Sequence, residues 1–215
     1  MCNPCISDLP WLGNHCLRCA IPLESACEGI ICADCQHRPP AFRRCISAFE
    51  YQQPISHMIK RIKADAYAPQ LRQLSELLTE RITAAYGDQQ RPDILIPVPL
   101  HWSRQLRRGF NQSQGIAQIL ALGMGNSKIY SHCLRRRAYS RPQHLQGKHQ
   151  RLHSMHNAFE VRAAKTIQGA TVALIDDVVT TGATASSAAK ALLAAGVYAV
   201  DIWCIARTGW HIDSA

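Results

Sequence analysis

The chain has 215 residues, 47% of them hydrophobic, which is enough for one sizeable core and a small additional module. It contains no run of about 18 uncharged apolar residues and no basic and apolar leader, so we expect a cytoplasmic protein with no membrane span. The net charge of +9 is concentrated at positions 101–165, where twelve Lys and Arg residues meet one acid, and this favours a polyanionic partner (nucleic acid or a phosphate ligand) over a merely solvated basic surface.

Cysteines dominate the N-terminal 38 residues. Because the cytosol keeps thiols reduced, we do not read the ten cysteines of the chain as a disulfide framework. Six of them form three Cys-x-x-Cys pairs, at Cys2/Cys5, Cys16/Cys19 and Cys32/Cys35. The second and third pairs, with twelve residues between them, match the spacing of a structural zinc ribbon, in which four thiolates hold Zn²⁺.

Two alternatives compete with this quartet. The first and second pairs form another possible quartet, and only one of the two can use Cys16 and Cys19. The cysteines can also be reduced thiols that bind no metal. We expect the metal ligands to be Cys16, Cys19, Cys32 and Cys35. This predicts a metal-folded module over residues 1–38, followed by a separate domain over residues 39–215.

Downstream of residue 38, apolar periodicity predicts strands that alternate with helices. The expected strands cover residues 46–51, 93–97, 129–134, 159–161, 172–175 and 199–206. The expected helices cover residues 55–62, 69–85, 113–122 and 184–195. Residues 135–155 are poor in apolar side chains and predict a long loop. This alternation is typical of an α/β fold with a doubly wound parallel sheet.

Residues 172–184 are the most informative segment. Four apolar residues predict a buried strand, and Asp176 and Asp177 follow at its carboxyl end, before a turn rich in threonine that leads into an alanine-rich helix. In such a sheet, the backbone N–H groups of the turn and the helix N-terminus bind anions. The two carboxylates can accept hydrogen bonds from vicinal hydroxyls or face Mg²⁺ through water. Together these features describe a site for a sugar phosphate; the alternative is an ordinary strand, turn and helix with two solvated acids.

The same segment resembles the phosphoribosyl-pyrophosphate (PRPP) motif of type I phosphoribosyltransferases. Over nearly the whole chain, the order of motifs resembles the ComF family, the competence proteins of natural transformation. Besides the N-terminal cysteines and residues 176–184, the motifs are Phe49-Glu-Tyr51, Ile59-Lys-Arg-Ile-Lys63, Pro97-Val-Pro99, Arg108-Gly-Phe-Asn-Gln112, Arg141-Pro-Gln143 and Asn157-Ala-Phe159.

The resemblance implies a type I phosphoribosyltransferase-like sheet that binds PRPP, or a related ribose phosphate, together with Mg²⁺. The residues that it implies for PRPP are Asp176, Asp177, Thr180, Thr181, Gly182, Ala183, Thr184, Pro99, Leu100 and His101. The residues that it implies for pyrophosphate or DNA are Arg104, Arg107, Arg108, Asn111 and Gln112. It identifies no catalytic residue.

The resemblance also implies a protein that handles incoming single-stranded DNA, together with other competence or DNA-processing proteins. The basic block, with aromatic residues interspersed, suits phosphate tracking and base stacking. Two other functions compete with this one. The first is an active phosphoribosyltransferase of nucleotide salvage with an unknown acceptor. The second is a zinc-ribbon interaction module with a vestigial sugar site. The intact Asp176, Asp177 and Gly182 argue against the vestigial site.

Overall fold

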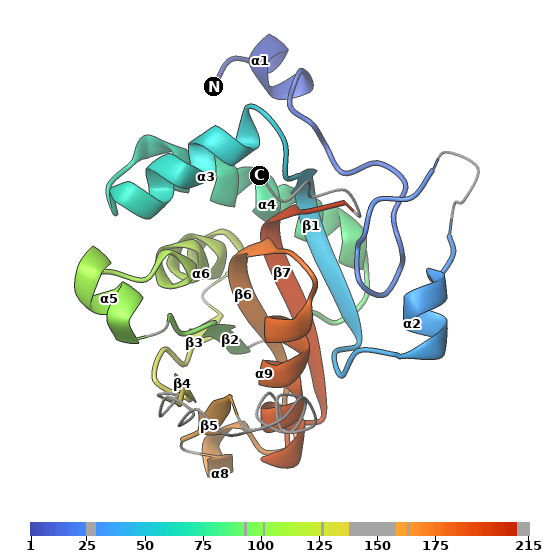
Figure 1. Ribbon diagram of the computed structural model, residues 1–215, viewed down its shortest axis with the longest axis vertical. Coiled ribbons are helices and arrows are strands. Elements are labelled where there is room, and N and C mark those ends of the chain that lie inside the picture. The colour runs from blue at the N-terminus through green and yellow to red at the C-terminus, as the bar shows by residue number, and fades with distance from the viewer. Residues whose placement is uncertain are drawn as a thin grey trace, which may run out of the picture.

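The computed structural model describes residues 1–24, 29–92, 94–100, 102–125, 127–137, 158–162 and 164–209 (Figure 1). Its centre is a five-stranded sheet with the strand order β1-β7-β6-β2-β3, in which all neighbouring strands run parallel. The strands are β1 (Arg44–Glu50), β2 (Ile94–Pro97), β3 (Lys128–Ile129), β6 (Thr171–Val179) and β7 (Ala199–Arg207). A separate antiparallel pair joins β4 (Leu134–Arg136) to β5 (Phe159–Val161).

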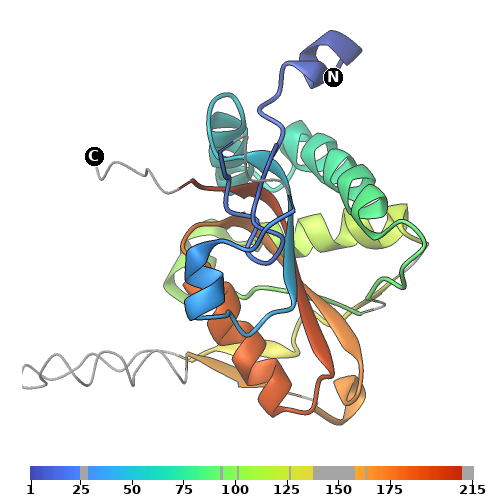
Figure 2. The ribbon, with the colours of Figure 1, turned by 90° about the vertical axis from the view of Figure 1, so that its right-hand side faces the viewer.

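Helices cover both faces of the sheet (Figure 2). One face carries α3 (Ile55–Ala64), α4 (Pro69–Tyr86) and α6 (Gln112–Gly123), and the other carries α9 (Ala183–Ala194). Residues of β6 alternate between the two cores, since Ala173 and Ile175 pack toward α4 and α6, while Val172 and Leu174 pack toward α9. A strand buried on both faces reads as a continuous apolar run. The predicted α/β fold with a doubly wound parallel sheet is confirmed.

Four short helices complete the described elements. They are α1 (Asn3–Ser7), α2 (Ala33–His37), α5 (Trp102–Arg108) and α8 (Ala164–Ile167). None of these short helices was predicted. Among the described residues, no helix is both long enough and apolar enough to cross a membrane.

The N-terminal segment runs along the outer edge of β1. Leu12 donates its backbone N–H to the carbonyl of Ala48 at 2.9 Å, and the Trp11 ring packs on Phe49 with 4.6 Å between centroids. Further along, Cys45 donates its backbone N–H to the carbonyl of Arg18 at 2.8 Å. Residues before 39 therefore cover an edge that would otherwise expose unpaired backbone groups. The domain boundary at residue 38 stays a prediction.

One predicted strand is wrong. Residues 129–134 form the end of β3 and the start of β4, because the chain turns between them: Cys133 donates its N–H back to the carbonyl of Tyr130 at 3.3 Å. The other predicted strands and helices are found with ends shifted by a few residues. Most of the predicted loop, from residue 138 onward, lies outside the described residues.

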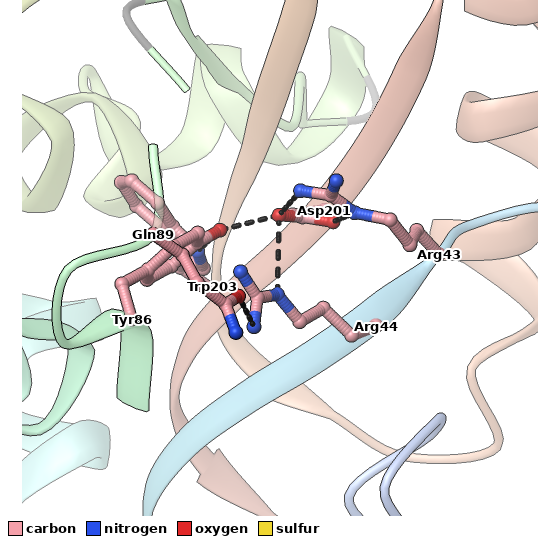
Figure 3. A network of polar contacts seen from close by, with 6 residues as sticks. All are labelled: Arg43, Arg44, Tyr86, Gln89, Asp201 and Trp203. Atoms are coloured by element: carbon pink, nitrogen blue, oxygen red, sulfur yellow. Dashed lines mark hydrogen bonds and ion pairs between the residues drawn. The ribbon is translucent and has the colours of Figure 1, made fainter. Parts of the chain in front are cut away.

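A buried carboxylate joins the amino-terminal part of the sheet to α4 (Figure 3). Asp201 of β7 has no solvent exposure and accepts two hydrogen bonds from Arg43, at 2.6 and 2.8 Å, and one from Arg44 at 3.4 Å. Tyr86, at the end of α4, donates its hydroxyl to the same carboxylate, and burial together with Asp201 raises the pKa of Tyr86. The guanidinium of Arg44 lies 3.8 Å from the centre of the Tyr86 ring. These contacts connect three elements far from the carboxyl end of the sheet.

We expect Asp201→Asn to lower the free energy of unfolding by about 3 kcal/mol. This is the lower end of the range for breaking a buried ion pair, because both arginines keep some access to water. Tyr86→Phe, which keeps the ring beneath Arg44 and removes one hydrogen bond, should cost about 1 kcal/mol. Urea denaturation followed by circular dichroism measures both values. Equal stability of Asp201→Asn and the unmodified chain would contradict this account of the network.

Candidate functional site

The second and third cysteine pairs come together as one cluster. The Sγ atoms of Cys16, Cys19, Cys32 and Cys35 all lie within 4.8 Å of one another, and those of Cys19 and Cys32 are 3.7 Å apart. A tetrahedral zinc site with Zn–S bonds of about 2.3 Å needs sulfurs roughly 3.8 Å apart. Three of the four side chains are buried. The residues therefore fit a closed, structural metal site of the zinc type.

Backbone N–H groups already favour a thiolate in this cluster. Arg18, Cys19 and Cys32 donate their N–H groups to the Cys16 sulfur at 3.4, 3.5 and 3.3 Å. Although burial raises the pKa of the Cys16 thiol, these donors lower it to about 7. Burial raises the pKa of Cys19 to about 11 and also raises the pKa of Cys35. A cation among the four sulfurs would favour their thiolate forms and would hold them together.

The first cysteine pair lies elsewhere. Cys2, which immediately precedes α1, and Cys5, on α1, are both exposed, and their sulfurs are 3.1 Å apart. Figure 1 shows α1 and α2 at separate places on the molecule, and α2 carries Cys35. Among the described residues, the competing quartet is not assembled.

Two adjacent carboxylates lie near the carboxyl end of β6. Asp176 accepts the backbone N–H of Asp177 at 2.9 Å and the hydroxyl of Ser113 at 3.3 Å. Asp177 accepts the N–H of Val178 at 2.8 Å and forms an ion pair with Lys63 of α3, with 3.0 Å between Nζ and Oδ2. Both acids keep partial exposure. They are therefore held in fixed orientations, yet they can still reach a ligand.

The two acids differ in their electrostatic surroundings. Burial and the neighbouring charge of Asp177 raise the pKa of Asp176 well above its usual range. Lys63 neutralises Asp177 directly. One acid is thus poised to hold a proton, while the other is paired with a cation, until a ligand or a metal ion changes the local charge.

A tight turn connects β6 to α9. Gly182 has a φ of 75°, a left-handed conformation that glycine adopts without strain, and its carbonyl accepts the N–H of Ser186 at 2.8 Å. Ala183 begins α9 and donates its N–H to the Thr181 hydroxyl oxygen at 3.3 Å. The side chains of Thr180, Thr181 and Thr184 are exposed. The predicted turn thus presents hydroxyls and helix N-terminal N–H groups to the outside.

The loop after β2 lies beside the acids. Val98 donates its N–H to the carbonyl of Ile175 at 2.9 Å, and its own carbonyl accepts the Asn111 amide at 3.1 Å. Asn111 also caps α6, since its side-chain oxygen accepts the N–H of Ser113 at 3.1 Å. Pro99 and Leu100 are half-buried in this loop, and Gln112 is buried. Asn111 therefore ties the loop to the start of α6, whose Ser113 reaches Asp176.

The basic residues predicted for pyrophosphate or DNA lie on α5. Arg107 is exposed and Arg108 is half-buried. Trp102 and Leu106, one helical turn apart, are 57% and 78% exposed, which is unusual for large apolar side chains. His101 and the side chain of Arg104 lie outside the described residues. The role of this group stays a prediction.

A cavity of about 680 Å³ separates the cysteine cluster from the turn after β6. Cys19, Cys32 and Cys35 line one side, and Thr180, Thr181 and Gly182 line the other. Residues far apart in the sequence therefore meet at one opening at the carboxyl end of the sheet.

Three residues of this region were not among the predicted site residues. They are Lys63, which pairs with Asp177, Ser113, which reaches Asp176, and Arg207, which bonds both the cysteine segment and the turn. The signal for Lys63 is present in the sequence, since it ends the motif at residues 59–63. Ser113 directly follows the motif that ends at Gln112. No local pattern distinguishes Arg207.

Several solved structures resemble this fold loosely. Glutamine PRPP amidotransferase from B. subtilis is 18% identical with a TM-score of 0.41, over 61% of this chain and 25% of that one. Purine phosphoribosyltransferase from Pyrococcus horikoshii is 15% identical with a TM-score of 0.39, over 66% of this chain and 76% of that one. Both scores lie below 0.5, which is too low for any conclusion about function.

Sequence relatives align along nearly the whole chain, although no family model matches it. DNA utilization protein YhgH of Salmonella typhimurium is 32% identical, over 97% of this chain and 90% of that protein. Competence protein F of Haemophilus influenzae is 29% identical, over 96% and 90%. Competence protein ComFC of Bacillus subtilis is 27% identical, over 91% and 79%. The chain therefore belongs to the ComF family, as the order of its motifs predicts.

Proposed function

We propose that this protein acts in competence or DNA utilization, as the names of its relatives say of them. In this proposal it binds PRPP or a related ribose phosphate with Mg²⁺, handles single-stranded DNA, and carries a structural Zn²⁺. The observation that supports the ligand site most strongly is the pair of oriented carboxylates, Asp176 and Asp177, beside an exposed hydroxyl-rich turn.

The parts of a ribose phosphate match this arrangement one by one. Asp176 and Asp177 would accept hydrogen bonds from the ribose 2′ and 3′ hydroxyls. The N–H groups and hydroxyls of residues 180–184 would bind the 5′-phosphate. Pro99, Leu100 and His101 would line the pyrophosphate side. Mg²⁺, when bound, would neutralise charge on the pyrophosphate.

Lys63 adds a cation to the same place. Its Nζ lies 3.0 Å from Asp177, and its side chain is 30% exposed. A ligand that brings both phosphate and Mg²⁺ would compete for the two partners of this ion pair. We infer that Lys63 shields Asp177 until the ligand and its metal arrive.

DNA handling rests on α5 and on the basic residues after it. Arg107 and Arg108 on α5 are joined by Arg135, Arg136 and Arg137, in and just after β4. Trp102, more than half exposed on the same helix, would offer a ring for base stacking. Guanidinium groups near an exposed aromatic ring suit a single strand better than a protein partner of mixed charge.

Asp176→Asn tests the ligand site with opposite effects on stability and on binding. The raised pKa of Asp176 means that its ionised form is unfavourable in the folded chain. The folded chain therefore loses stability as the pH rises above about 3.9, the ordinary pKa of an aspartate side chain. The Asn variant should therefore have a higher Tm than the unmodified chain, and the gain should grow with pH. Each kcal/mol of unfolding free energy that the substitution adds raises the Tm of a chain of this size by about 2–4 °C.

Adding PRPP and Mg²⁺ should raise the Tm of the unmodified chain by about 5–10 °C at a hundredfold excess over Kd, and should leave Asp176→Asn unchanged. Thermal denaturation monitored by fluorescence gives both readings. Asp88→Asn, at an exposed acid after α4, is the matched control and should respond like the unmodified chain. A full ligand response in Asp176→Asn would contradict the proposed role of the carboxylate.

Zinc content tests the metal site. Elemental analysis should find about one Zn²⁺ per chain, and Cys16→Ser should lose it, because the variant removes the sulfur that three backbone N–H groups orient. The double variant Cys2→Ser with Cys5→Ser is the control and should keep its metal. Because the competing quartet also contains Cys16, zinc loss from both Cys16→Ser and the double variant would instead favour that quartet.

Salt dependence tests the DNA site. Affinity for a single-stranded oligonucleotide should fall steeply with salt, and Arg107→Ala with Arg108→Ala should weaken it and reduce the log–log slope by about 1.4, or roughly 0.7 per phosphate contact. Arg72→Ala with Arg91→Ala removes the same charge at α4 and the segment after it and serves as the control. Fluorescence anisotropy at several salt concentrations measures both. If both double variants lost the same affinity for the oligonucleotide, the effect would come from net charge and not from a site on α5.

A further inference from the structure

Arg207, the last residue of β7, is a buried cation with an unusual set of partners. Arg207 is only 3% exposed to solvent. It donates to the carbonyls of Cys19 at 2.9 Å, of Val179 at 3.2 Å and of Thr208 at 2.8 Å, and also to the carbonyl of Thr180. Every one of these acceptors is neutral. Within the part of the chain that the structure describes, no carboxylate forms an ion pair with Arg207.

A buried guanidinium with neutral partners is unfavourable unless an anion lies nearby. Two anionic centres flank Arg207 in the proposed function. On one side are Cys16, Cys19, Cys32 and Cys35, whose four thiolates with one Zn²⁺ carry a formal charge of about −2. On the other side is the turn after β6, where the phosphate would bind. Arg207 itself lines the cavity between the two.

The hydrogen bonds of Arg207 fall on both centres. Its Nε bonds the carbonyl of Cys19, a residue of the cysteine cluster, while its Nη1 bonds the carbonyls of Val179 and Thr180, where the turn begins. A shift of the Cys19 backbone therefore moves a donor that also fixes Thr180. Cys19 and Thr180 are 161 positions apart in the sequence, so this one side chain directly connects two distant segments.

We propose that Arg207 is a positioning residue that couples metal binding at the cysteine cluster to phosphate binding at the turn. With metal bound, the cysteine segment holds the Cys19 carbonyl in place, and the guanidinium bonded to it keeps Thr180 and the turn in the shape that would receive the phosphate. Loss of the metal releases the cysteine segment, so that the contacts of Arg207 with Cys19 and Thr180 both loosen. The proposal rests on the proposed ribose-phosphate site and adds a regulatory input to it.

The chemistry requires arginine at this position. A guanidinium presents five donors in a planar fork and can serve several backbone segments at once, whereas a lysine ammonium is a compact point charge on a flexible stem. Arg207→Lys therefore keeps the charge and removes the bridge. The hydrogen bonds of Arg207 go to backbone carbonyls and to Thr208, so we expect it to affect the affinity of the turn and not a chemical step.

The test is a linkage cycle that uses ribose 5-phosphate as the probe. Its Kd is measured by calorimetry on the zinc-loaded and the metal-depleted full chain, and zinc affinity is measured by chelator competition with and without the probe. In the unmodified chain, metal removal should weaken probe binding about 10-fold or more, and the probe should tighten zinc binding by the same factor. In Arg207→Lys both factors should approach 1.

Arg43→Lys is the matched control, because Arg43 also bonds a buried partner, Asp201, but at the other end of β7. It should lower stability and leave the coupling intact. A purely structural role for Arg207 would give the same pattern as this control, and full coupling in Arg207→Lys would overturn the proposal. Absence of coupling in the unmodified chain would overturn it as well.

Amide hydrogen exchange separates this proposal from the ligand proposal and needs no variant. Zinc removal should accelerate exchange at residues 180–184 of the unmodified chain, whether or not a ribose phosphate binds there. If the probe does not bind the zinc-loaded chain, the proposed ligand is wrong, and the exchange result alone decides the coupling. Unchanged exchange at residues 180–184 after zinc removal would contradict the proposed coupling.

Discussion

Parallel pairing of β6 with β2 and β7 is the constraint on which the rest of the structure depends. Because the three strands run in one direction, their carboxyl ends meet at a single edge of the sheet. This places Asp176 and Asp177 beside the loop at Pro97–Leu100, and it places the start of the turn after β6 beside Arg207. The residues of the site are therefore positioned by the sheet register and not by long, flexible side chains. The Asp201 network helps to fix that register from the opposite end of β7.

The N-terminal segment adds a second element to this edge. It pairs along β1 and brings the cysteine cluster against the turn after β6, across a cavity that both segments line. A small cysteine-rich segment could have been attached anywhere on the surface without affecting the sheet. Its position next to the turn is therefore what makes the proposed link between metal and phosphate physically reasonable, and the hydrogen bonds of Arg207 to Cys19 and Thr180 would give that link a mechanism.

Local pattern was sufficient for the elements on which the site is built. The apolar run before Asp176 predicts β6, the glycine and hydroxyls after it predict the turn, and cysteine spacing predicts the cluster, because each depends on neighbours in sequence. Contacts between distant segments could not be predicted in this way. The pairing of Leu12 with Ala48, the ion pair of Lys63 with Asp177, and the split of residues 129–134 into two strands all depend on tertiary packing. The helix α5 was missed because it is short and basic, and because its two large apolar residues, Trp102 and Leu106, are exposed instead of packed in a core.

In the proposed function, this edge of the sheet binds a ribose phosphate through its diol and its phosphate together. Calorimetric titration of the zinc-loaded chain with PRPP, ribose 5-phosphate and pyrophosphate, each with Mg²⁺, tests it most directly. The account predicts that PRPP binds most tightly, that ribose 5-phosphate binds more weakly, and that pyrophosphate binds weakest of the three. Equal affinity for all three would show that the site recognises phosphate charge alone, and absence of binding would contradict the account.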